Sequence, residues 1–439
     1  MLGAGPFFTI PAFVATMHGP QCMLGWLLAM LIVMCDGLIW AELGAALPGS
    51  GGTYHYFREI FRGSVWGRFL PFMFIWQFLA SGTLEVASGY IATSQFTFSL
   101  WQNALKSLHE KSGLSERVVI GIVATLFVGL IFLACCQRIR SLGRLIMFLI
   151  VGVLASVGTI IVLGMLNFDA TLINFPPNAF HLDRTFFTGL GAASTIAVFD
   201  YLGYYNICHM GEEVRTPTKT IPRAVLLSIV IVASIYVLMN LSFIGVVPWQ
   251  EILKDGSLAN TNISAAFMTK LYGERAATIF TGLIIWTCLA GLFAMTLGYS
   301  RILYAAAKNG DFFSPFAALH PTRHYPWAAL ALLSGLTAAL CYFSLDFVLK
   351  AAVTVRIILQ FIGQIFALHV LRRSGKHPLP FRMWLYPLPC IIALAGWIFL
   401  LSSSDWKLWG LVLLVYGSGL VAFFVRNRFA PPADGTSAA

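Results

Sequence analysis

Eleven apolar stretches recur along the chain, and each approaches the length that a helix needs to cross a lipid bilayer. Such a helix takes about 20 mostly apolar residues. Only 10% of the 439 residues are charged, against about 25% in soluble domains, so the chain lacks the polar surface of a water-soluble enzyme. The sequence therefore predicts an all-helical integral membrane protein, with spans near 21–47, 65–95, 118–136, 144–166, 185–211, 221–247, 276–306, 326–343, 347–371, 383–401 and 406–425.

The first sixteen residues form a further apolar segment that is too short to span a bilayer. It has neither the positively charged start nor the small-residue cleavage pattern of a signal peptide. We expect this segment to be the second half of a first helix whose opening half is absent, which gives twelve helices in one transmembrane domain over residues 1–429. The polar segment 430–439 (APPADGTSAA) is expected to be a disordered tail.

The distribution of Lys and Arg predicts the orientation. Cytoplasmic loops of membrane proteins carry an excess of these residues. With twelve alternating helices and a cytoplasmic C-terminus, eighteen Lys and Arg lie in cytoplasmic segments and nine lie outside. Both termini are therefore expected in the cytoplasm of a cell with the protein in its plasma membrane. The net charge of +10 reflects this orientation, and nucleic acid is not an expected partner.

Two of the expected helices contain sequences that interrupt a membrane helix: Gly3-Ala4-Gly5-Pro6 at the start, and Phe199-Asp200-Tyr201-Leu202-Gly203 within 185–211. Irregular backbone at membrane depth has to line a cavity. The two breaks lie five helices apart, as expected for two inverted five-helix repeats (about 1–166 and 184–371) followed by two further helices over 383–425. Paired breaks indicate the binding site of a transporter. The alternative is that the glycines only permit close helix packing.

The two breaks offer complementary chemistry. Backbone N–H groups after Gly3 and Gly5 open a helix N-terminus, which suits a carboxylate. The unwound carbonyl groups expected from Phe199 to Tyr201 suit an ammonium group or another cation. A zwitterion fits between the two breaks.

Four sequence blocks carry a family resemblance: GAGPFFTIPA (3–12), AELGAALPGSGGTYHYFREIF (41–61), GEEVRTPTKTIPRA (211–224) and GYSRILYAAAKNGDFF (298–313). The chain resembles the amino acid–polyamine–organocation (APC) superfamily and is similar to prokaryotic relatives of the L-type amino acid transporters. The resemblance implies the LeuT-like inverted-repeat fold and alternating-access transport of amino acids or amines. It also implies that Gly3, Ala4 and Gly5 hold the substrate carboxylate and that Phe199 is an aromatic gate, with Tyr201 and Gly203 in the same unwound stretch.

The chain departs from this family in several places. Many members have a small residue in place of Asp200 and a glycine in place of Leu202. Some proton-coupled members use a lysine in the fifth helix, but 145–165 contains no basic residue. The loop 101–117 has no cysteine, so no disulfide-linked heavy chain is expected as a partner.

Three ionisable residues are singled out within the expected spans: Glu85, Asp200 and Arg356. Each costs at least about 2.5–3.5 kcal/mol at the bilayer centre unless it has a partner or a wet cavity. All three are candidates for coupling. Asp200 either receives a substrate ammonium or a proton, or caps freed backbone N–H groups. Glu85 and Arg356 either pair as a structural strut or take part in coupling.

Glu42 lies near a cytoplasmic helix end. Its expected partners there are Arg58, Arg215 or Arg223.

The sequence thus favours a secondary active transporter of amino acids that works as an exchanger or a proton symporter. A polyamine or cationic amine transporter, suggested by Asp200 and Glu85, and a non-transporting paralogue remain alternatives. No HExxH or GxxxxGK[ST] motif occurs, so neither an intramembrane metalloprotease nor an ATP-driven pump is predicted. The cysteines show no CxxC spacing, and His209 with Glu213 lacks a third ligand, so no metal or cofactor is expected.

Overall fold

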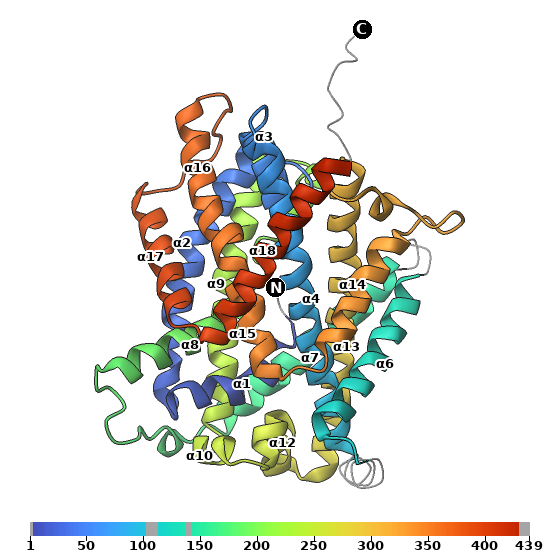
Figure 1. Cartoon of the computed structure of the whole chain (residues 1–439). Helices are drawn as coiled ribbons and strands as arrows, with labels where there is room; N and C mark the ends of the chain where they lie inside the picture. The colour runs from blue at the N-terminus through green and yellow to red at the C-terminus, as the bar shows by residue number, and fades with distance from the viewer. Residues whose placement is uncertain (1–2, 102–112, 137–141, 430–439) are drawn as a thin grey trace.

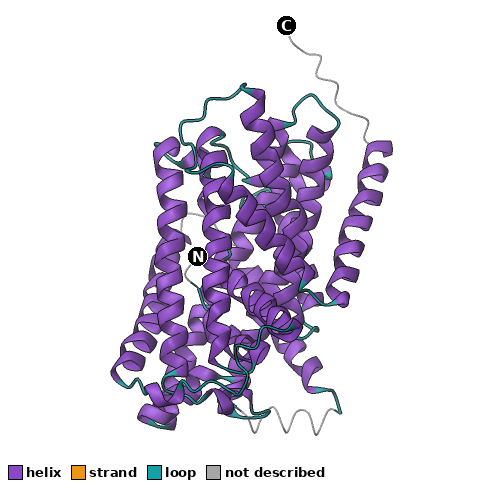
Figure 2. Ribbon diagram, turned by 90° about the vertical axis from the view of Figure 1, so that its left-hand side faces the viewer, coloured by secondary structure: helices purple, strands orange, loops and turns teal. Residues whose placement is uncertain are grey.

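The computed structural model describes residues 3–101, 113–136 and 142–429, and this part of the chain is built almost entirely of helices (Figures 1 and 2). The expected tail 430–439 lies outside the described residues. The first half of the chain contains α1 (Gly5–Met17), α2 (Leu24–Ala46), α3 (Thr53–Ile60), α4 (Trp66–Leu100), α6 (Glu116–Cys135) and α7 (Leu142–Leu166).

The second half begins with α8 (Arg184–Tyr201), two short 3₁₀ turns, η4 (Asn206–His209) and η5 (Gly211–Glu213), and α9 (Pro217–Ile244). It continues with α10 (Trp249–Leu253), α11 (Leu258–Thr261), α12 (Ile263–Tyr272), α13 (Glu274–Lys308), α14 (Trp327–Leu340), α15 (Leu345–Arg356), the π-helical turn η7 (Ile357–Ile362), α16 (Gly363–Ser374), α17 (Leu388–Ser402) and α18 (Trp406–Phe429).

Each of the eleven apolar stretches coincides with a helix. Within the described residues, seven helical segments are long and apolar enough to cross a membrane: Pro20–Ala46, Trp66–Leu100, Glu116–Cys135, Pro217–Ile244, Glu274–Lys308, Leu345–Ser374 and Trp406–Arg428. Shorter apolar helices cover Gly5–Met17, Ile150–Leu166, Trp327–Leu340 and Leu388–Ser402. The all-helical class is confirmed, whereas the number of twelve crossings stays a prediction.

Helix α1 begins at the predicted break. Ala4 is its N-cap residue, and Pro6 follows in the first turn, where no backbone N–H is needed. Figure 1 shows α1 within the lower half of the bundle, and α1 packs against α8. A helix N-terminus is therefore placed inside the molecule, away from both of its ends.

Helix α8 ends later than the sequence suggested. Phe199, Asp200 and Tyr201 lie in its last turn, so the prediction that this stretch is unwound was wrong. The helix stops because Leu202 is extended (φ −50°, ψ 140°) and Gly203 has φ +100°, a conformation that favours glycine. The chain continues in the short turns η4 and η5.

The turns after α8 join the segment that follows α2. The backbone of Ser50 pairs with that of Met210, and the N–H of Gly51 donates to the carbonyl oxygen of His209 at 3.0 Å. The N–H of Ser50 also donates to Oε1 of Glu212 at 3.3 Å. We call these paired segments, 48–53 and 206–213, the backbone latch. It connects the two halves of the chain.

Glu42 has a partner that the sequence did not predict. Nε and an η nitrogen of Arg372 donate to its two carboxylate oxygens, each at 2.6 Å, and the N–H of Met383 donates to Oε2 at 2.8 Å. Arg58, one of the expected partners, pairs instead with Asp311 at 3.5 Å. The bond between Glu42 and Arg372 fastens α16 to α2.

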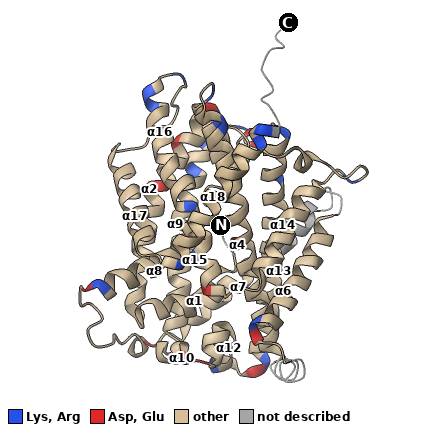
Figure 3. Cartoon of the chain, in the orientation of Figure 1, with Lys and Arg blue, Asp and Glu red and all other residues tan. Residues whose placement is uncertain are grey.

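Charged residues lie mostly at the two ends of the bundle. Figure 3 shows Lys and Arg gathered at the end where α16 and α18 finish, and both signs of charge at the opposite end, near α10 and α12. Between α9 and α13 the chain forms the short helices α10 to α12, of which α12 packs against α13.

Candidate functional site

The two breaks meet at one cavity of about 120 Å³. Helix α1 starts at this cavity and α8 ends beside it, and α4, α9 and α13 complete its wall. The lining residues are Gly3, Ala4, Gly5, Phe8, Glu85, Ser88, Gly89, Phe199, Asp200, Leu202, Tyr236, Cys288, Gly291, Leu292 and Met295.

Five of the seven predicted substrate-binding residues line this cavity, namely Gly3, Ala4, Gly5, Phe199 and Asp200. Tyr201 is buried outside the lining, where its ring packs edge-on against Trp26 with 5.2 Å between the centroids. Gly203 also lies outside the lining, in the turn that ends α8. The structure therefore brings the two breaks together at one cavity. Tyr201 and Gly203 lie at the end of α8 and do not line this cavity.

The first turn of α1 supplies backbone donors to the cavity. The opening N–H groups of a helix have no carbonyl partner in the preceding turn and carry the positive end of its dipole. The N–H of Gly3 donates to the hydroxyl of Tyr236, from α9, at 3.0 Å. Such a helix start is suited to an anionic group such as a carboxylate.

Asp200 presents a carboxylate to the same end of α1. Its Oδ2 accepts a hydrogen bond from Oγ1 of Thr9 at 2.7 Å. Its Oδ1 is buried and has no hydrogen-bond partner among the described residues. A buried polar atom without a partner is costly. Asp200 is thus an acceptor available to an ammonium group or a proton.

Gly5 is required by the closeness of α1 to Asp200. A Cβ atom added at Gly5 would lie 2.1 Å from Oδ1 of Asp200, far inside the van der Waals contact distance. The absence of a side chain at Gly5 lets the acidic group approach the helix start directly.

Glu85 and Arg356 form a buried ion pair. The hydroxyl of Tyr299 also donates to Oε2 of Glu85 at 2.8 Å, while Arg356 donates to Ser81 at 3.1 Å and to the hydroxyl of Tyr205 at 3.2 Å. The pairing considered from the sequence is therefore present. Because Arg356 pairs with Glu85, Asp200 is the carboxyl group of the cavity wall that has no cationic partner among the described residues.

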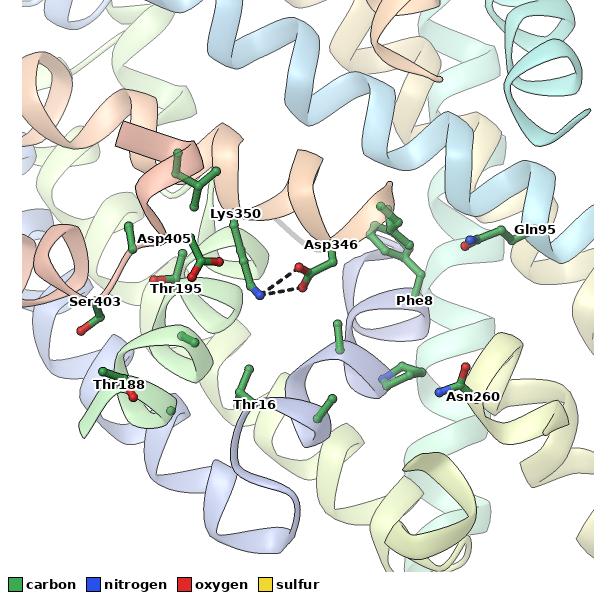
Figure 4. Close-up of a pocket in the computed structure, with 18 of the residues that line it drawn as sticks. Phe8, Thr16, Gln95, Thr188, Thr195, Asn260, Asp346, Lys350, Ser403 and Asp405 are labelled. Carbon is green, nitrogen blue, oxygen red and sulfur yellow. Dashed lines mark hydrogen bonds and ion pairs between the residues drawn. The ribbon is translucent and has the colours of Figure 1, made fainter. Parts of the chain in front are cut away.

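A larger cavity of about 680 Å³ adjoins the first on the side of α10 and α12. Polar side chains point into it, including Thr16, Gln95, Asn260 and Asp405, and Nζ of Lys350 pairs there with Asp346 at 2.9 Å (Figure 4). We call this space the outer cavity. Its wall combines these polar groups with apolar side chains, which suits a path for water and small solutes.

Phe8 lines both cavities, and its ring centroid lies 6.4 Å from that of Phe199. The two rings therefore stand where the small cavity meets the outer cavity. Sequence reasoning missed Phe8, although it directly follows the GAGPF motif. It also missed Thr9, one helical turn after Gly5, and Tyr236, whose hydroxyl within an apolar run was the available signal.

The described residues contain no group of three or more His, Cys, Asp and Glu side chains placed to hold a metal ion.

Comparison with known proteins places this geometry in context. A family model described as amino acid permease matches residues 1–427. A serine/threonine exchanger of Bacillus subtilis is 26% identical, covering 98% of this chain and 94% of its own length. The large neutral amino acids transporter small subunit 2 of Mus musculus is 27% identical, covering 91% and 73% respectively. The mouse cationic amino acid transporter 4 is 26% identical, covering 79% and 53%.

Proposed function

Because this chain belongs to the amino acid permease family, we propose that it is a secondary active transporter that carries an α-amino acid through the small cavity by alternating access. It is a multi-pass membrane protein, and its relatives are transporters. The proposal adds the route, the binding groups and the coupling.

One observation carries the proposal: the open start of α1 and Asp200, whose Oδ1 has no hydrogen-bond partner among the described residues, line the same cavity. The substrate carboxylate binds at the N–H groups of Ala4 and Gly5, and its ammonium group binds Asp200. The small size of this cavity, about 120 Å³, and the similarity to a serine/threonine exchanger favour a small amino acid such as serine or threonine.

Phe8 and Phe199 act as the gate on the outer side. Substrate enters through the outer cavity and passes between these two rings. The end of the bundle near α10 and α12 then faces the outside of the cell, and the C-terminus faces the cytoplasm, in agreement with the excess of Lys and Arg at the opposite end (Figure 3).

Transport of cationic amines is the second candidate, because Asp200 is acidic and one relative is a cationic amino acid transporter. A diamine would need two acceptors in the cavity. Glu85 already binds Arg356, so the cavity offers one free carboxylate. The geometry favours a substrate with a single ammonium group beside a carboxylate.

Proteoliposomes containing the full chain test the proposal. They are loaded with unlabelled L-serine, and the uptake of radiolabelled L-serine is measured with and without a pH gradient. Competing L-threonine, L-leucine, L-arginine and putrescine identify the preferred class. We expect saturable exchange that L-threonine inhibits and putrescine does not.

Asp200→Ala is expected to abolish this exchange, whereas Asp255→Asn, an exposed loop position, leaves it unchanged. The proposal fails if none of the labelled amino acids, tested in turn, exchanges or accumulates. Inhibition by putrescine alone would instead establish an amine transporter.

A further inference from the structure

A second acidic residue, Asp36, is buried in the middle of α2 and takes no part in the cavity. Its side chain is fully buried. One carboxylate oxygen accepts a hydrogen bond from the hydroxyl of Tyr204, and the other accepts from Nε1 of Trp397 at 3.3 Å. Both donors are neutral.

The surroundings of Asp36 supply no counter-charge. Among the described residues, no Lys, Arg or His forms an ion pair with it. Helix α9 packs apolar Val225 and Ile229 against the neighbouring Gly37. The titratable groups nearest to Asp36 are Cys35 on its own helix, Tyr204 and Tyr205 after α8, and Cys390 on α17.

Two arginine side chains on segments near Asp36 are already engaged. Arg372 binds Glu42, which lies further along α2. Arg356 binds Glu85 and reaches this region only through the hydroxyl of Tyr205. His209, which packs against Tyr205 and Trp40, forms the next layer. Asp36 is thus an acidic group inside the membrane domain with two neutral donors and no cation.

An ionised carboxylate in such a place is costly because two neutral hydrogen bonds do not replace its hydration. Taking up a proton from hydronium removes the charge and releases a water molecule. Giving the proton back requires water to reach the side chain. In the described structure the full burial of Asp36 prevents this exchange, so a change of conformation has to open it.

Tyr204 connects Asp36 to the part of the chain that has to move. It lies in segment 202–205, between the end of α8 and η4, directly after Gly203 at φ +100°. The next residue, Tyr205, binds Arg356. Segment 202–205 therefore contains Tyr204, which donates a hydrogen bond to Asp36, and Tyr205, which accepts one from Arg356 of the Glu85–Arg356 pair.

From this arrangement we propose that Asp36 is a proton-binding site of the transport cycle, which loads and releases a proton as segment 202–205 moves. The inference rests on the proposed function, because alternating access supplies the movement of α8. It assigns proton coupling to a residue outside the substrate cavity, so Asp200 is free to bind the substrate ammonium.

The first test does not need transport. Infrared difference spectra of the purified full chain are recorded between acidic and alkaline buffer. We expect a carbonyl band of a protonated carboxylic acid that disappears as the pH rises. Asp36→Asn loses this band, and Asp200→Asn retains it. A band that is unchanged in Asp36→Asn overturns the proposal.

The second test follows L-serine exchange from about pH 5 to about pH 8 in serine-loaded proteoliposomes. Net proton movement is recorded separately, by a pH-sensitive dye inside proteoliposomes that hold no amino acid and take up L-serine. Asp36→Asn is expected to lose the pH dependence and the proton movement while exchange continues. Asp36→Glu retains both. An unchanged pH profile in Asp36→Asn would show that Asp36 takes no part in the cycle.

Tyr204→Phe is a second variant, which keeps the proposal testable if Asp36→Asn fails to fold. It removes one donor but leaves the carboxylic acid in place, and we expect it to move the midpoint of the pH profile. A midpoint that stays in place contradicts the link to segment 202–205. If no amino acid exchanges at all, the proposed function fails, and the infrared band alone decides whether Asp36 takes up a proton.

Discussion

Gly5 and Asp200 lie in direct contact although 195 positions separate them, and a Cβ atom at Gly5 would stand 2.1 Å from Oδ1 of Asp200. This contact brings the start of α1 and the end of α8 to one point. The positive end of one helix and the acidic group of another thus face the same small volume, which is the physical basis for recognising a zwitterion.

Gly5→Ala is expected to reduce L-serine exchange by at least tenfold. The added methyl group displaces Asp200 or α1, and overpacking of this kind costs about 1–3 kcal/mol. Initial rates in proteoliposomes measure the effect. Gly129→Ala on α6 is the matched control, because a Cβ atom there meets nothing within 4 Å. Equal losses in both variants would show that the effect is not specific to the site.

Thr9→Val is expected to lower exchange by about tenfold or more. The substitution keeps the side-chain shape but removes the hydroxyl that donates to Asp200 at 2.7 Å, and a hydrogen bond to a charged group contributes about 1.5–3 kcal/mol. Thr9→Ser retains the donor and should restore most of the rate. If Val and Ser behave alike, the hydroxyl does not act through Asp200.

Removing one member of the Glu85–Arg356 pair is expected to destabilise the fold. A buried charge without its partner costs about 3–5 kcal/mol, whereas loss of both charges costs less. Glu85→Gln and Arg356→Met should each lower the apparent Tm in detergent, followed by tryptophan fluorescence. The double variant should recover part of the loss. Strictly additive losses would mean that the ion pair is not an energetic unit.

Arg372→Lys is expected to weaken the connection of α16 to α2. Lysine keeps the charge but cannot make both 2.6 Å bonds to Glu42, nor stack its head group as Arg372 does, 3.8 Å from the ring centre of Tyr386. The apparent Tm should fall, with a loss of about 1.5–3 kcal/mol. The neighbouring Arg373 is exposed, so Arg373→Lys should leave the apparent Tm unchanged.

Asp183 makes the start of α8 sensitive to acid. Its Oδ1 caps the helix by accepting from the N–H of Phe186 at 2.8 Å, and this bond lowers the pKa of Asp183. A lowered folded-state pKa stabilises the helix above the unfolded value of about 3.9, and this stabilisation is lost as the pH falls through the folded pKa. Hydrogen exchange of the first turn of α8 should therefore increase in acid relative to Asp183→Asn, which keeps an acceptor but not the charge. Parallel profiles would contradict this account.

The positions of the membrane helices and of the first break could be predicted because they depend on local sequence. Runs of apolar residues fix where helices lie, and Gly3-Ala4-Gly5-Pro6 marks where α1 starts. The predicted break began at Phe199, whereas α8 continues to Tyr201, so three residues expected to be unwound are helical. The backbone turns at Leu202 and Gly203, which the predicted break included.

The partners of buried charges could not be predicted, because they come from distant segments. Glu42 binds an arginine 330 positions away, and the donors of Asp36 are 168 and 361 positions away. Local spacing favoured Arg58, Arg215 or Arg223 for Glu42. Asp36 was overlooked for the same reason, since a single acidic residue in an apolar run shows nothing of the hydroxyl and indole groups that enclose it.

The backbone latch has a consequence for how this protein tolerates sequence change. Two of its contacts, the Ser50–Met210 pairing and the bond from Gly51 to His209, join main-chain atoms that every amino acid except proline provides in full. Natural variants can therefore differ in most side chains of the latch without losing these two main-chain contacts. The vulnerable positions are the glycines. Gly51 and Gly52, at φ +110° and +57°, would also bring a new side chain against Tyr54 or His209, and a Cβ atom at Gly211 would lie 2.8 Å from the carbonyl oxygen of Gly49. We expect sequence drift across the latch to be broad except at its glycines.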